Sequence, residues 1–108
     1  MSGKPKLMTL SLEKALQRRP IGSTEEYGPR ARIVTKYFNP CGAGTWLVTE
    51  GEKQKNGDWL FFGYVHIQEW EAGYFMLSEL ENVELPYGMG IERDVFAKGT
   101  VLELMGDV

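Results

Sequence analysis

The sequence predicts an α+β fold, with a mainly antiparallel sheet of five or six strands and two short helices. Short segments rich in β-branched and aromatic residues recur along the chain, as in strands. The pair Asn56-Gly57 stands between two of these segments and is typical of a hairpin. With 108 residues, 43% of them hydrophobic, the chain suits a single domain over residues 1–108, with a core from about residue 6 to residue 105.

The first element is a short amphipathic helix, predicted over residues 8–19. Leu12, Ala15 and Leu16 share one helical face, because they are spaced three and four residues apart. Thr9 is placed to cap the first turn with its hydroxyl oxygen. Residues 20–30 follow as a loop, since they contain two prolines, two glycines and no hydrophobic period.

Four strands come next in the predicted order. The third of them is apolar on both faces, so we expect it in the middle of the sheet and covered on both sides. Asn56-Gly57 precedes it and predicts a type I′ turn, in which both central residues take positive φ angles. The four predicted strands span residues 32–38, 45–52, 59–67 and 73–77.

The C-terminal third begins with Ser78 and Glu81, whose spacing is that of a capping box. A second short helix is therefore expected there, ending before Pro86. Residues 91–96 and 101–105, on either side of Lys98-Gly99, are interpreted as two closing strands.

The stretch from Asn39 to Glu50, "NPCGAGTWLVTE", resembles neither a phosphate-binding loop nor the site of a catalytic cysteine. Its glycines lead into a strand, whereas a phosphate loop leads into a helix and carries a lysine. Cys41 and His66 are the chain's only cysteine and histidine, and nothing in their spacing brings them together. We interpret the stretch as a turn, and we expect no metal and no cofactor, because zinc requires a cluster of such ligands.

Four residues are the candidates for binding: Glu50, Trp70, Arg93 and Asp94. Arg93 is flanked on its own face of a strand by Ile91 and Val95, so it is expected to be partly buried and paired with a carboxylate. Glu50 is the first choice of partner, with Asp58 and Glu103 as substitutes; the alternative is an arginine that binds a ligand. Trp70 stands between two glutamates and is expected to be exposed.

Charge is distributed unevenly along the chain. Residues 1–36 contain eight basic and three acidic residues, while residues 37–108 contain four basic and twelve acidic ones. A basic segment can bind nucleic acid, but the acidic remainder favours weak binding or none. The sequence has no apolar run near the length of a membrane span and only one cysteine, so we expect a cytoplasmic protein that does not enter membranes.

Several stretches together resemble a bacterial family of proteins of unknown function, number 2958 in that series. They are "KLMT", "YFNPCGAGTWLVTE", "FFGYV", "GYFMLSELE" and "LPYGMGIERDVF", and they cover the chain from about Lys6 to Phe96. The resemblance implies a small cytoplasmic protein encoded on bacterial mobile elements such as conjugative plasmids. It implies no activity, cofactor or catalytic residue.

The function predicted first is therefore a non-enzymatic module that binds another protein. One alternative is a nucleic-acid-binding accessory protein that uses the basic residues of segment 4–36. The other is an enzyme that works through carboxylates, with Glu50, Glu69, Glu71 and Asp94 as the candidates.

Overall fold

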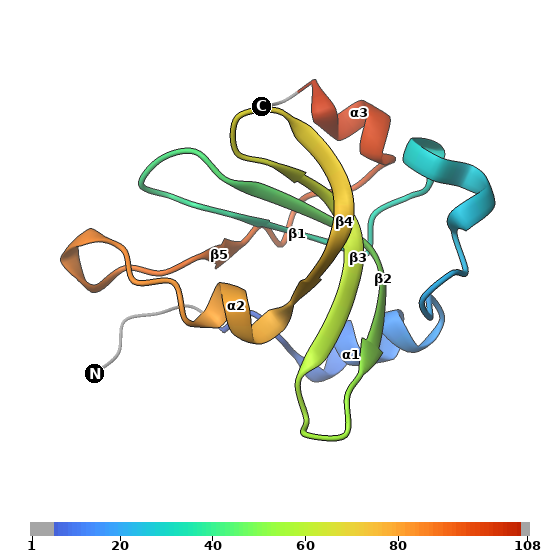
Figure 1. Cartoon of the computed structure of the whole chain (residues 1–108), viewed down its shortest axis with the longest axis horizontal. Coiled ribbons are helices and arrows are strands. Elements are labelled where there is room, and N and C mark those ends of the chain that lie inside the picture. The colour runs from blue at the N-terminus through green and yellow to red at the C-terminus, as the bar shows by residue number, and fades with distance from the viewer. Residues whose placement is uncertain (1–5, 107–108) are drawn as a thin grey trace.

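The computed structural model describes residues 6–106 and shows the predicted α+β fold (Figure 1). Five antiparallel strands form one sheet in the order β4-β3-β2-β1-β5. The predicted central strand, β3, pairs with β2 on one side and β4 on the other, which confirms its interior position. The strands are β1 (Thr35–Phe38), β2 (Thr45–Lys53), β3 (Trp59–His66), β4 (Trp70–Met76) and β5 (Glu92–Arg93).

Three α-helices and two 3₁₀-helices accompany the sheet within the described residues. The first α-helix confirms the predicted N-terminal helix, and Thr9 caps it by accepting a hydrogen bond from the Leu12 amide at 3.1 Å. The helices are α1 (Leu10–Gln17), η1 (Glu25–Arg30), α2 (Leu77–Glu81), η2 (Pro86–Gly88) and α3 (Val101–Met105).

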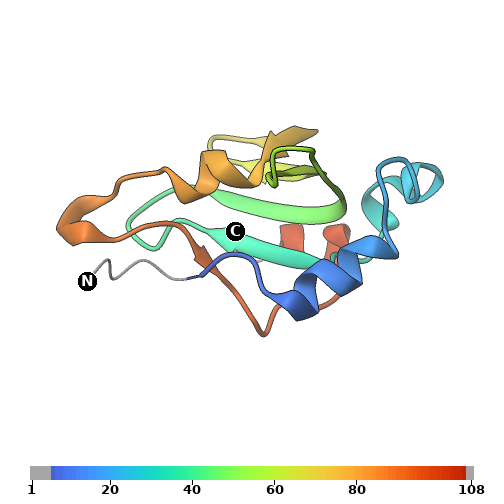
Figure 2. The same cartoon turned by 90° about the horizontal axis from the view of Figure 1, so that it is seen from below.

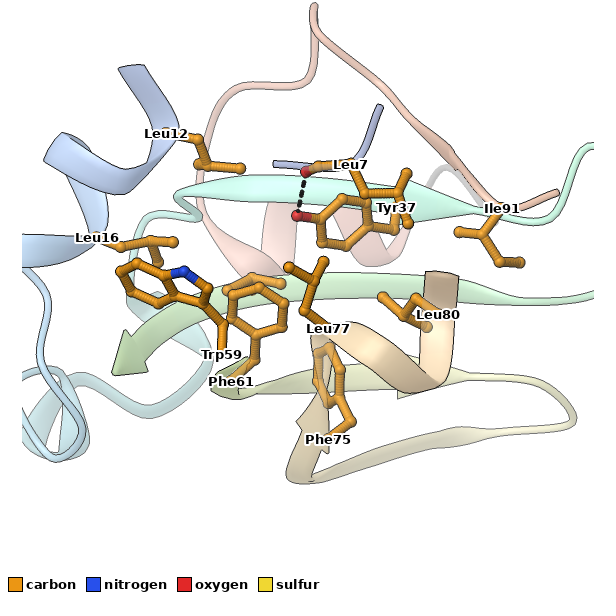
Figure 3. Close-up of a cluster of buried hydrophobic side chains, with 11 residues drawn as sticks. Leu7, Leu12, Leu16, Tyr37, Trp59, Phe61, Phe75, Leu77, Leu80 and Ile91 are labelled. Atoms are coloured by element: carbon orange, nitrogen blue, oxygen red, sulfur yellow. Dashed lines mark hydrogen bonds between the residues drawn. The ribbon is translucent and has the colours of Figure 1, made fainter. Parts of the chain in front are cut away.

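The main hydrophobic core lies between one face of the sheet and the helices α1 and α2 (Figure 3). Tyr37 and Phe61 are completely buried at its centre, with ring centroids 6.0 Å apart. Leu16 from α1 and Leu77 from α2 belong to the same cluster of buried side chains. The Tyr37 hydroxyl donates to the Leu7 carbonyl at 2.8 Å, which satisfies the one polar atom of a buried tyrosine. We call this side the helix-covered face.

The opposite face of the sheet carries a smaller core. Val101 and Leu104 of α3 pack there on Leu47 of β2. The segment 18–32, which contains η1, lies beyond the C-terminal end of α1 at one side of the molecule (Figures 1 and 2). The Val101 amide donates to the Ala31 carbonyl at 3.0 Å, so α3 is joined to this segment.

The prediction of a strand over residues 101–105 was wrong, because these residues form the helix α3. Thr100 and Glu103 make a capping box: the Glu103 amide donates to the Thr100 hydroxyl, and the Thr100 amide donates to the Glu103 carboxylate. These two bonds, at 3.2 and 2.8 Å, fix the first turn of a helix in a segment whose apolar residues suit a strand equally well.

The strand predicted over residues 91–96 is shorter than expected and contains only Glu92 and Arg93. Asp94 ends it, because its carboxylate accepts a hydrogen bond from the Phe96 amide at 3.0 Å and turns the chain away from the sheet. The predicted capping box at Ser78 and Glu81 is also wrong. The helix α2 starts earlier, and Glu79 accepts from the Met76 amide at 2.7 Å.

The hairpin between β2 and β3 is present, but its turn is not of type I′. Of the two central residues only Gly57 has a positive φ, 91°. The Gly57 amide donates to the Gln54 carbonyl at 3.0 Å, and the Gln54 amide donates to the Asp58 carbonyl at 2.7 Å. This is the pattern of a three-residue loop that ends in a left-handed glycine, which is the second common solution for a tight hairpin.

Gly57→Val is expected to lower the free energy of unfolding by about 1–2 kcal/mol, because a β-branched residue resists a positive φ. Space is not the reason, since a side chain at Gly57 meets no atom within 4 Å. Gly42→Val is the control: Gly42 is equally open and its φ is ordinary. Urea denaturation measures both, and equal midpoints for the two variants would show that the left-handed angle has no importance.

Candidate functional site

Glu50 of β2 is the polar centre of the sheet's second face, with only 2% of its surface exposed. One carboxylate oxygen accepts from the Gly22 amide at 2.7 Å, and the other accepts from both the amide and the hydroxyl of Thr24. Three donors on one buried carboxylate satisfy its charge without a cation. Glu50 therefore fastens the segment 18–32 to the sheet, although that segment has little regular structure.

Next to Glu50 lies a cavity of about 120 Å³ with aromatic walls, which we call the aromatic pocket. In its wall, the Phe62 ring lies 6.0 Å from the Tyr64 ring and 5.1 Å from the Tyr74 ring, both edge to face. Burial, and to a smaller degree the Glu50 charge, raise the pKa of the Tyr64 hydroxyl. Eight residues line the pocket: Gly22, Thr24, Glu25, Gly28, Glu50, Phe62, Tyr64 and Tyr74.

The strand β4 is the outer edge of the sheet beside this pocket. It pairs with β3 alone, so within residues 6–106 no strand pairs with its other edge. Its exposed residues include Glu71 and Ala72, and Tyr74 keeps 63% of its surface exposed. Seven residues of unpaired edge are a ready template for another strand.

Glu50 and Arg93 do not form the predicted ion pair, because they lie on opposite faces of the sheet. Arg93 stands opposite Tyr37 on the helix-covered face, whereas Glu50 stands opposite Phe62 on the other. A β-bulge between Val48 and Glu50 shifts the alternation of β2 and turns Glu50 to the second face. The ion pairs found among the described residues do not include Arg93, and its buried Nε has no hydrogen-bond partner.

The other two candidates have structural contacts. Asp94 forms an ion pair with Lys36 at 3.8 Å, and its second oxygen makes the turn at Phe96. Trp70 was expected to be exposed, but it is partly buried: it packs on the smaller core, and its ring lies 5.1 Å from that of His66. The four candidates are thus spread over both faces and do not form one site.

Catalytic pairs receive no support from the geometry of the described residues. Cys41 is exposed on a turn, where its sulfur contacts that of Met89 at 3.7 Å, while His66 packs on Trp70. Glu50 lines the aromatic pocket, but Glu69 and Glu71 line a separate hollow at the turn between β3 and β4. Within residues 6–106, no three His, Cys, Asp or Glu side chains are grouped to hold a metal ion.

A second cavity, of about 380 Å³, is lined by residues of the segment 18–32. Four arginines line it, and we call it the arginine pocket. Its walls are Arg18, Arg19, Ser23, Thr24, Tyr27, Arg30, Ala31 and Arg32. Thr24 lines both the aromatic pocket and the arginine pocket, and its amide donates to the Glu50 carboxylate. Glu50 therefore fixes a wall residue that the two pockets share.

A wide, open hollow of about 600 Å³ lies beside the β2–β3 hairpin. Its polar wall includes Asp58, which accepts hydrogen bonds from the hydroxyl and amide of Ser78 at 2.5 and 3.0 Å. The Ser78 hydroxyl is the main cause that lowers the pKa of the Asp58 carboxyl. These bonds attach α2 to the hairpin and give Asp58 a structural role.

Comparison with known proteins decides the family. Residues 7–103 match the family described as "Protein of unknown function (DUF2958)". The chain belongs to this family. No curated protein and no solved structure matches the chain. Membership in DUF2958 confirms the family that the motifs resembled, and it assigns no activity to either pocket. None of the helices in residues 6–106 has the length and apolar character needed to cross a bilayer.

Glu50 was a binding candidate, but the three aromatic residues of the pocket, Phe62, Tyr64 and Tyr74, were not predicted as binding residues from the sequence. A signal was present, because Phe62 and Tyr64 are two residues apart in β3 and therefore share a face. The contribution of Tyr74 depends on the pairing of β3 with β4, in which Phe62 stands opposite Tyr74. The arginines of the second pocket were noted only as part of a basic segment.

Proposed function

We propose that the protein is a non-enzymatic interaction module that binds an extended segment of a partner protein along β4. The observation that carries this proposal is the unpaired edge of β4 beside an aromatic pocket on the same sheet. Strand addition supplies affinity through main-chain hydrogen bonds, and pockets next to the edge supply specificity through side chains.

The side chains along β4 indicate which residue types the partner segment should contain. Tyr74 and the pocket behind it suit an apolar or aromatic side chain, because exposed tyrosine is a frequent anchor at protein interfaces. Glu69 and Glu71 are exposed at the start of the strand and favour basic residues in the partner segment. The resemblance to proteins of mobile elements supports a cytoplasmic role in plasmid maintenance, transfer or evasion of host defence.

Affinity capture with a matched pair of variants tests this function. The chain is used as bait in lysate of its native host, and bound proteins are quantified by mass spectrometry. We expect a partner that the wild type and Tyr87→Lys retain equally, and that Tyr74→Lys loses by at least about tenfold, since a central aromatic anchor contributes about 2 kcal/mol or more. Tyr87 is the control because it is 98% exposed and lies in η2, away from β4.

The proposal fails if Tyr74→Lys retains the partner as well as the wild type does. It fails equally if Tyr87→Lys loses the partner to the same extent, because the effect would then depend on added charge and not on the edge strand. Circular dichroism of both variants checks that each remains folded.

A further inference from the structure

Four arginines line the arginine pocket although they come from two parts of the chain. Arg18 and Arg19 follow the end of α1, whereas Arg30 and Arg32 lie at the end of η1 and just after it. Half of the eight basic residues in the first 36 positions are thus gathered around one cavity of about 380 Å³. This gathering is a property of the fold, since 13 positions separate Arg19 from Arg32.

The pocket is held in place by bonds to the sheet and to α3. The Gly51 amide of β2 donates to the Arg19 carbonyl at 3.0 Å, and the Ile33 amide donates to the Gly99 carbonyl at 2.9 Å. Arg19 also donates from Nη1 to the Arg32 carbonyl at 3.1 Å, which ties the two walls together. A binding site whose backbone is fixed before binding loses less entropy when the ligand arrives.

The positive charge of the pocket lacks a partner within the described part of the chain. None of the four arginines takes part in the ion pairs found among residues 6–106, and no acidic residue lines the cavity. Glu103 responds to Arg32 only at a distance: hydrogen bonds with Thr100 are the main cause of its lowered pKa, and the Arg32 charge adds the least. Like charges placed together around a cavity favour an anion between them.

The shape and the remaining wall residues narrow the class of anion. Planar guanidinium groups bind phosphate oxygens through two parallel hydrogen bonds, and several of them suit a polyphosphate or a phosphodiester chain. Tyr27, which is 51% exposed, offers a ring at the same cavity on which a base can stack. The cavity volume lies within the range typical of small-ligand sites.

We propose that the arginine pocket binds the phosphate groups of a nucleotide, with the base against Tyr27. The nucleotide is either free or part of a single strand, because both present the same phosphate and base. This site is separate from β4, so it stands or falls independently of the proposed partner-protein function.

Fluorescence anisotropy and calorimetry test the site with two probes, ATP and a labelled single-stranded DNA of about 12 nucleotides. Arg18→Gln combined with Arg30→Gln removes two exposed pocket charges. Lys14→Gln combined with Lys55→Gln removes the same charge from exposed positions outside the pocket. We expect the arginine variant to lose at least about tenfold in affinity, because it loses charge-assisted hydrogen bonds to the phosphates, and the lysine variant to stay within about twofold.

The two probes distinguish the sources of the phosphate. Tighter binding of ATP assigns a free nucleotide, and tighter binding of the DNA assigns a strand. With DNA, the slope of log affinity against log salt concentration is measured between about 50 and 200 mM salt. In the arginine variant this slope is expected to become shallower by the equivalent of about two phosphate contacts. Tyr27→Ala is expected to weaken either ligand and leave the salt dependence unchanged, since a stacked ring carries no charge.

Two results would overturn the proposal. One is the absence of binding of both probes at about 1 mM ligand, which is weaker than a built site of this kind provides. The other is an equal loss of affinity in the arginine and lysine variants, which would assign the binding to net charge and not to the pocket.

Discussion

Replacing Gly63 with alanine is expected to lower the free energy of unfolding by at least about 3 kcal/mol, the range of severe overpacking. A methyl group at this position would lie 1.9 Å from the Leu47 carbonyl oxygen and 3.1 Å from the Val48 Cα. Both atoms belong to the backbone of the neighbouring strand, so no side-chain rotation can relieve the overlap. β2 and β3 would have to separate in the middle of the sheet.

Gly73→Ala provides the matched control for this prediction. Gly73 stands directly opposite Gly63 in the pairing of β3 with β4, yet a methyl group there meets no atom within 4 Å. We expect it to change stability by no more than about 0.5 kcal/mol. Chemical denaturation followed by tryptophan fluorescence compares the two. Similar midpoints for both variants would contradict the close approach of β3 to β2.

Glu50→Gln is expected to lower the free energy of unfolding by about 2–4 kcal/mol, and the melting temperature by roughly 10 °C or more. The substitution keeps the shape of the side chain but replaces one accepting oxygen with an NH₂ group. That group would face a donor of Gly22 or Thr24, and a buried donor would lose its acceptor. The segment 18–32 should loosen as a result.

Glu52→Gln is the control for Glu50→Gln. Glu52 lies two residues further along β2 and is exposed, so removal of its charge should change stability by no more than about 0.5 kcal/mol. Thermal melts measure the stability of both variants. Hydrogen exchange then shows where the structure loosens, and faster exchange is expected at the amides of Gly22 and Thr24. If Glu50→Gln melts with the wild type, the carboxylate does not fasten the segment.

The sheet was predictable because its signals are local. β3 is apolar on both faces, and Asn56-Gly57 marks the hairpin before it, so the pairing of β2 with β3 followed from neighbouring residues. The helix α3 was open to the same reasoning, since Thr100 and Glu103 have the spacing of a capping box. There the apolar character of residues 101–105 was given too much weight against a capping signal.

The candidate sites were not predictable because they depend on contacts between distant segments. A single bulge after Val48 decides which face of the sheet Glu50 occupies, and the residue types of β2 do not predict this bulge. Arg93 was correctly expected to be partly buried, but its partner could not be chosen without knowing the faces. The arginine pocket arises from bonds between segment 18–32 and the sheet, with no periodic pattern behind it.

Hydrogen–deuterium exchange of the protein with and without its captured partner tests most directly whether β4 is the binding edge. We predict that amides of Trp70–Met76 which face away from β3 exchange quickly in the free protein and become protected in the complex, because a partner strand would accept hydrogen bonds from them. Protection confined to other segments, with the exchange of β4 unchanged, would contradict the proposed mode of binding.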